Sequence, residues 1–94
     1  MIDISRIRKY TNSHEDYAIN WFNNNGFDGE VVHQWVSETA FRVEKDGVED
    51  TFRLTAAQQS PDKCDIKRYM EDFGKSFRMK VEIVNLKRQL AKGR

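Results

Sequence analysis

Six cationic side chains lie close together at the end of the chain, and Glu82 is the only acidic residue among them. The six are Arg78, Lys80, Lys87, Arg88, Lys92 and Arg94. Guanidinium and ammonium groups neutralise phosphates, and a cluster of them gives salt-dependent binding that depends little on base sequence. These residues are therefore the candidate nucleic-acid-binding site of the chain, and an acidic protein surface is a second partner that would suit them.

The same six residues also have a purely structural interpretation. Lys and Arg on an edge strand prevent sheets from pairing edge to edge, and charged residues are usually solvated surface. Proteins that bind single strands also stack bases on exposed aromatic rings, whereas most aromatic residues here fall on expected core faces. Both interpretations remain open on the sequence.

No group of residues in the sequence is arranged for catalysis. His14, Glu15 and Asp16 are adjacent, so on a helix their side chains diverge and do not converge on one metal ion. His33 has no neighbours at metal-ligand spacing, and no histidine is placed to activate Cys64, the single cysteine. We expect a non-enzymatic protein with no catalytic residue, no metal site and no cofactor.

One short segment contains the letters of a metal-nuclease motif. Residues 61–67 read PDKCDIK, in which P-D is followed by D-x-K. This motif and the expected αβββαβ order resemble the PD-(D/E)XK nuclease family, where acidic residues on neighbouring strands hold Mg²⁺. Here Asp62 and Asp65 fall in one expected helix, and the expected strands contain no (D/E)-x-K. The resemblance is to the topology of a degenerate PD-(D/E)XK-like fold without its motif, and topology alone does not confer activity.

Charge is unevenly distributed along the chain, although the formal net charge is only +1. Residues 10–60 carry a net charge of −6, and residues 61–94 carry +5. Complementary acidic and basic faces can attract each other within the fold or between two copies of the chain. A protein-interaction or self-associating accessory module, of the kind found in phages and mobile elements, is therefore the alternative to nucleic-acid contact.

Length and composition predict one small domain spanning residues 1–94. A chain of 94 residues can bury one core, and 38% hydrophobic with 33% charged residues is typical of a globular protein. No apolar run approaches the length of a membrane-spanning segment, so we expect no membrane partner. A single cysteine suits a reducing compartment, which predicts a cytoplasmic location.

Hydrophobic periodicity predicts the elements that would position the candidate residues in the first half of the chain. A helix is predicted over 13–25, ending at Gly26, by the apolar stripe of Tyr17, Ala18, Trp21 and Phe22. β-Branched and aromatic residues predict a strand inside the sheet over 30–36.

A hairpin is predicted around Asp46-Gly47, a strong tight-turn signal, with strands over 39–45 and 49–55. A two-residue loop would place Phe41 opposite Phe52, and a four-residue loop would place Val43 there instead. Both registers keep the same apolar face towards the core.

The second half of the chain predicts a helix, a strand and a tail. Ser60 and Pro61 are typical of a helix start and Gly74 of a helix end, which predicts a helix over 61–73. A half-buried strand is predicted over 76–84 by the strict alternation of Phe77, Met79, Val81 and Ile83 with polar residues. Residues 86–94 are expected to form a short C-terminal helix or basic tail, and residues 1–11 an irregular N-terminal arm. The sum is an α+β domain in the order α-β-β-β-α-β.

Overall fold

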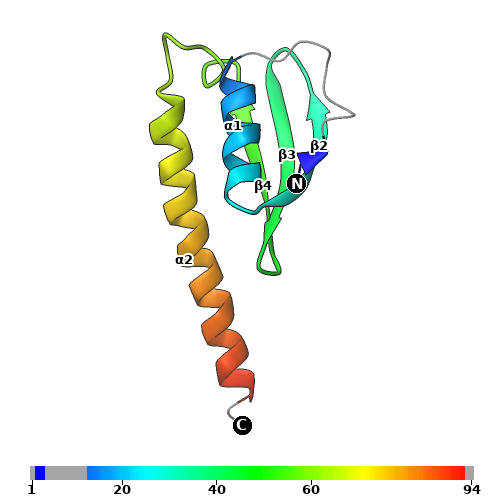
Figure 1. Ribbon diagram of the computed structural model, residues 1–94, viewed down its shortest axis with the longest axis vertical. Coiled ribbons are helices and arrows are strands. Elements are labelled where there is room, and N and C mark those ends of the chain that lie inside the picture. Colours follow the sequence, from blue (N-terminus) through cyan, green and yellow to red (C-terminus); the bar gives the residue numbers. More distant parts are fainter. Residues whose placement is uncertain (1, 4–12, 93–94) are drawn as a thin grey trace.

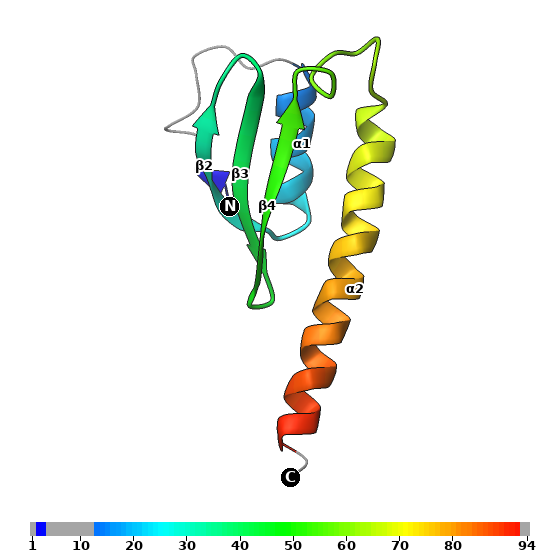
Figure 2. The same ribbon diagram turned by 180° about the vertical axis from the view of Figure 1, so that it is seen from behind.

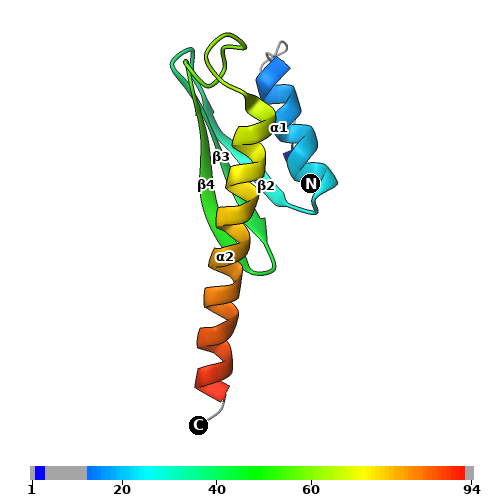
Figure 3. The same cartoon turned by 90° about the vertical axis from the view of Figure 1, so that its left-hand side faces the viewer.

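A computed structural model of the protein describes residues 2–3 and 13–92. It is an α+β domain in which both helices pack on the same face of a four-stranded sheet (Figures 1 and 3). The elements are β1 (Ile2–Asp3), α1 (Ser13–Asn24), β2 (Asp28–Gln34), β3 (Glu38–Lys45), β4 (Val48–Thr55) and α2 (Ile66–Lys92). The strand order is β1-β2-β3-β4, with β1 parallel to β2 and the other neighbours antiparallel. The predicted fold class and the first four predicted elements are confirmed, with bounds shifted by one or two residues.

Helix α1 ends where the sequence predicts, at a glycine in the left-handed conformation. Gly26 has a φ of 76°. The amide of Phe27 donates to the carbonyl oxygen of Phe22 at 3.0 Å, and that of Gly26 donates to Asn23 at 3.4 Å. These two bonds form a Schellman cap, which satisfies carbonyls that the helix leaves free. The cap fixes the direction in which the chain enters β2.

The β3–β4 hairpin has the two-residue loop that Asp46-Gly47 predicts. Both residues have positive φ, 55° and 77°, as a type I′ turn requires. Phe41 therefore lies opposite Phe52, which excludes the four-residue-loop alternative. The apolar residues of both strands face the helices, as predicted.

Strand β2 contains a bulge that the sequence did not predict. Val31 pairs with Phe41, but His33 pairs with the next residue of β3, Ala40, so Val32 is an extra residue. The bulge shifts the register of every residue pair that follows it in β2. Val31, before the bulge, is buried in the core, and His33, after it, lies opposite Ala40. The strand ends at Gln34, so Trp35 lies beyond the strand and is largely exposed.

A cluster of aromatic rings fills the space between the helices and the sheet. The ring of Phe22 lies 5.0 Å from that of Phe52 and 5.6 Å from that of Phe73, in edge-to-face arrangements. Such pairs stabilise a core beyond the area they bury. Phe77 extends this cluster along α2 through Phe27, at 4.9 Å.

The prediction for residues 61–84 is wrong: one helix, α2, replaces the expected helix over 61–73 and the expected strand over 76–84. Gly74 does not end a helix but lies buried within this one, where a Cβ would come 3.0 Å from the ring of Trp21. The helix begins later than expected, because Asp65 is its N-cap and not Ser60. The side chain of Asp65 accepts a hydrogen bond from the backbone amide of Arg68, in the first turn of the helix. The stretch predicted as a tail or short helix continues α2 as far as Lys92.

Helix α2 is much longer than the rest of the domain requires. Its 27 residues extend beyond the hairpin, and the molecule measures 51 × 27 × 22 Å as a result (Figures 1 and 2). Neither helix in the described part of the chain has the length and apolar character needed to cross a bilayer. Of the predicted N-terminal arm, only β1 falls within the described residues, and it adds a short edge to the sheet.

Candidate interaction surface on the C-terminal helix

Helix α2 carries apolar side chains on two different faces. Its inner face packs on the core through Met70, Phe73, Phe77, Val81 and Val84. A second set of four lies on the surface, and we call this set the outer seam: Met79, Ile83, Leu86 and Leu90. Their side chains are 64%, 52%, 58% and 69% exposed. Large apolar residues that gather on one exposed face indicate an interaction site, whereas scattered ones do not.

The outer seam points away from the domain. Successive residues of an α-helix are rotated by about 100°, so Phe77 and Met79 point in nearly opposite directions. The seam residues succeed one another at intervals of four, three and four. This spacing keeps them in one stripe along the helix, as in the a and d positions of a coiled coil. The end of α2 also runs past the sheet (Figure 2), so the seam is accessible from outside.

Polar residues define where the outer seam ends. One turn and two turns before Met79, the same face of α2 carries Lys75 and Asp72, both exposed. Glu82 and Lys87 flank the seam on opposite sides, and both are exposed as well. The apolar stripe therefore covers about 16 Å of helix, from Met79 to Leu90, with charged residues at its borders.

The six predicted cationic residues are not gathered on one face. Lys80 turns to the hairpin, where its Nζ lies 3.2 Å from Asp50 Oδ2. Arg88 also reaches the hairpin, since a Cβ at Gly47 would lie 3.2 Å from its guanidinium. Two of the six charges therefore lie against the chain's own β3–β4 hairpin.

The remaining cations point in different directions. Arg78 and Lys87 are nine residues apart, which places them on opposite sides of α2. Lys92 lies near the Arg78 side, and all three are exposed. Arg94 lies outside the described residues. A straight phosphate backbone would meet only part of this set at one time.

The acidic middle of the chain lies mainly on the face of the sheet that the helices leave open. Arg42 is surrounded there by three carboxylates, Glu30 at 3.3 Å, Glu49 at 3.3 Å and Glu44 at 3.9 Å. Hydrogen bonds from Arg42 to Glu30 and Glu49 raise the pKa of the arginine. Because the acidic residues pair with an arginine of their own face, part of the charge asymmetry in the sequence is neutralised locally.

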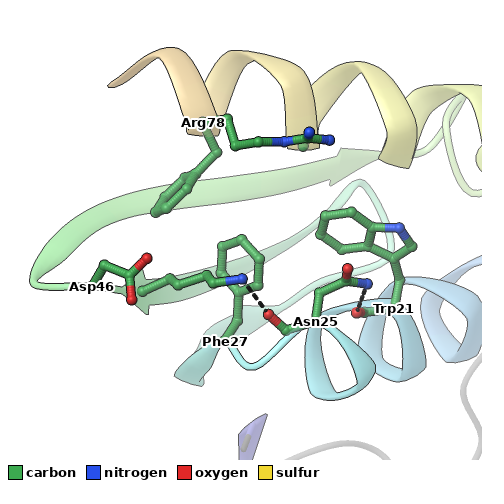
Figure 4. Close-up of a pocket in the computed structure, with 8 residues that line it drawn as sticks. Trp21, Asn25, Phe27, Asp46 and Arg78 are labelled. Carbon is green, nitrogen blue, oxygen red and sulfur yellow. Dashed lines mark hydrogen bonds between the residues drawn. The ribbon is translucent and has the colours of Figure 1, made fainter. Parts of the chain in front are cut away.

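A pocket of about 280 Å³ lies between the end of α1, the hairpin turn and α2 (Figure 4). Its lining residues are Trp21, Asn25, Phe27, Lys45, Asp46, Gly74, Phe77 and Arg78. The ammonium of Lys45 donates to the carbonyl oxygen of Asn25 at 2.7 Å and lies 5.4 Å from the centre of the Phe27 ring. This cation therefore stabilises the C-terminal end of α1.

A carboxyl group lies inside the protein in the first turn of α1. Glu15 is fully buried and accepts hydrogen bonds from Gln34 Nε2 at 2.6 Å and Thr39 Oγ1 at 3.1 Å. The signal in the sequence is its spacing, because Glu15 lies three and seven residues before the buried Ala18 and Phe22. Its adjacent residue His14 points elsewhere, with Nδ1 at 2.8 Å from the carbonyl oxygen of Gln58.

The other residues considered for chemistry lie apart from one another. His33 stacks on Trp35 with ring centres 3.9 Å apart, and its Nε2 lies 3.6 Å from Glu38 Oε2. Burial raises the pKa of the Cys64 thiol, and the adjacent Asp65 adds to this effect, whereas a reactive thiol has a lowered pKa. In the described part of the chain, no three His, Cys, Asp or Glu side chains are grouped so as to hold a metal ion. The strand expected over 76–84, which completed the αβββαβ order of a PD-(D/E)XK nuclease, is part of helix α2.

Comparison with known proteins returns no relative for this chain: no family model, no curated protein and no solved structure matches it.

Proposed function

We propose that this protein is a self-associating interaction module that pairs with a second copy of itself through the outer seam of α2. The observation that supports this function is the row of four large apolar side chains, each more than half exposed, at coiled-coil spacing. Exposed apolar stripes of this kind favour burial against a matching stripe. Neither nucleic-acid contact nor an acidic partner would require them.

The position of the seam supports pairing between two copies. The domain packs on the opposite face of α2, so a second α2 can approach without meeting the sheet or α1. The seam is only about three helical turns long, which is short for a stable interface. Association should therefore depend on protein concentration over the micromolar range and above.

Sedimentation equilibrium over a wide range of concentrations tests this proposal. The wild-type chain should shift from monomer to dimer as concentration rises, and Ile83→Lys should remain monomeric because it places a charge in the seam. Asn85→Lys is the matched control, since it adds the same charge at an exposed position of α2 outside the seam. A wild-type chain that stays monomeric throughout, or an Asn85→Lys loss equal to that of Ile83→Lys, would contradict the proposal.

A second candidate function is contact with nucleic-acid phosphates, supported by the exposure of Arg78 in the middle of α2 and of Lys87 and Lys92 near its end. Titration with DNA and RNA at two salt concentrations tests it. The double variant Lys87→Gln/Lys92→Gln should bind more weakly and with a smaller salt dependence. Lys63→Gln/Lys67→Gln removes the same charge from exposed positions elsewhere. An equal loss of affinity in both double variants would mean that the nucleic acid is attracted by the overall positive charge and not by a site on α2. A wild-type chain that binds neither DNA nor RNA at low salt would exclude this function.

A further inference from the structure

We propose that the two copies of α2 pair in parallel and in register, so that each seam residue meets its own equivalent. This inference rests on the proposed self-association and adds the orientation of the partner. The charges beside the seam are the argument for the orientation. The residue types in the seam suit two strands, and the place of the domain on the helix leaves room for the second copy.

The residue types in the seam suit a parallel two-stranded coiled coil. The four-three-four spacing assigns Ile83 and Leu90 to a positions, and Met79 and Leu86 to d positions. Among parallel coiled coils, a β-branched residue at a with leucine at d favours two strands over three or four. Ile83 and Leu86 form this pair at the middle of the seam.

The charges beside the seam distinguish the two orientations. In this heptad assignment Glu82 is at g, while Lys80 and Lys87 are at e. Parallel helices bring a g residue next to the following e residue of the partner, which pairs Glu82 with the partner's Lys87 twice in the dimer. Antiparallel helices with the same seam in contact would instead bring Lys80 next to the partner's Lys87, twice. The parallel arrangement also brings Lys75, at the preceding g position, next to the partner's Lys80. It therefore offsets two repulsions with two ion pairs, whereas the antiparallel arrangement has two repulsions and no ion pair.

Each domain would lie on the far side of its own helix in such a dimer. Phe77, Val81 and Val84 hold α2 against the sheet from the face opposite the seam. The dimer would then have its two sheets outside and its two helix ends together.

A charge reversal tests the orientation because its effect has opposite signs in the two arrangements. Lys87→Glu should raise the dimer Kd by about threefold to tenfold at low salt if the helices are parallel, since Glu82 then faces a carboxylate. It should lower the Kd if they are antiparallel, since Lys80 then faces a carboxylate. Glu82→Lys/Lys87→Glu should restore wild-type affinity in the parallel dimer alone. Lys92→Glu is the control, with the same charge change at an exposed position away from the seam.

Cysteine cross-linking gives a second, independent readout in a Cys64→Ser background. Leu90→Cys alone should form a covalent dimer on mild oxidation, because equivalent a positions meet in a parallel pair. A mixture of Met79→Cys and Leu90→Cys chains that cross-links only between the two variants would overturn the parallel orientation and leave self-association standing. A wild-type chain that is monomeric in sedimentation would instead remove the proposed function itself, so the two failures are distinguishable.

Discussion

At the scale of single residues, the carboxyl group of Glu15 is part of the core. It is fully buried and joins α1 to two strands, by accepting from Gln34 on β2 and from Thr39 on β3. The hydroxyl of Thr39 is equally buried. Buried polar groups stabilise a fold only while they remain paired, so the buried hydroxyl of Thr39 and the buried carboxyl group of Glu15 are stabilised by the bond between them.

Replacing Glu15 by leucine should lower the free energy of unfolding by about 2–4 kcal/mol, because the fully buried hydroxyl of Thr39 loses this acceptor and Gln34 loses one hydrogen bond. Glu15→Gln should cost less, since its amide oxygen can still accept one of the two bonds. Urea denaturation monitored by circular dichroism measures both. The loss in Glu15→Leu/Thr39→Val should be smaller than the sum of the two single losses, and an additive result would mean that the pair is not coupled.

At the scale of elements, α2 explains why an alternating sequence is not always a strand. Residues two apart on a helix differ by about 200°, so Phe77 and Val81 point to one side while Met79 and Ile83 point to the other. A strand would place all four side chains on one face. A helix with apolar side chains on two opposite faces has the same alternating sequence pattern. Phe77 is buried and Met79 is exposed, as the helix requires.

Gly74 allows α2 to pass close to α1. A Cβ at this position would lie 3.0 and 3.1 Å from two ring carbons of Trp21, so a larger side chain would force the two helices apart. Gly74→Val should reduce the free energy of unfolding by about 1–3 kcal/mol in urea titrations, although valine is a better helix former than glycine. Lys75→Val places the same side chain at the exposed neighbouring site, where it should cost only a few tenths of a kcal/mol. An equal loss at both sites would contradict the packing explanation.

Local signals predicted those parts of the fold that local chemistry decides. Gly26 and Asp46-Gly47 adopt positive φ because their immediate neighbours demand it, so the cap of α1 and the hairpin register could be predicted from the sequence. Gly74 carries the same type of stop signal, but here it is overridden by packing against Trp21. That contact joins residues distant in sequence, so no local pattern could reveal it.

The candidate site was predicted in part. The sequence predicts which residues carry the positive charge, but not the directions in which their side chains point. Those directions follow from the continuous helix α2, which places Arg78 and Lys87 on opposite sides. Met79 and Ile83 were assigned to the core because the strand prediction required it, whereas the structure exposes them. The outer seam became visible only once the inner face of α2 was known.

At the scale of the whole molecule, self-association should link stability to concentration. Only folded chains can pair, so the dimer stabilises the native state by mass action. Above the Kd, a hundredfold rise in concentration is worth about 1.4 kcal/mol per chain, which should raise Tm by about 5–10 °C for a domain of this size. Differential scanning calorimetry should show this for the wild type. Ile83→Lys should have the same Tm at every concentration, and a wild-type Tm that does not change would contradict the linkage.

The inner face and the outer seam of α2 overlap along the chain, since Met79 and Ile83 alternate with Phe77, Val81 and Val84. Insertion or deletion of one residue within this stretch would rotate every later residue of the helix by about 100°. If the insertion or deletion precedes Val84, this residue would rotate out of the core. If it follows Val84, the later residues of the outer seam would no longer lie on the same face of α2 as Met79. Loops such as residues 56–65 can change in length without this effect. Between Met70 and Leu90 the number of residues is therefore itself under constraint, independently of which residues they are.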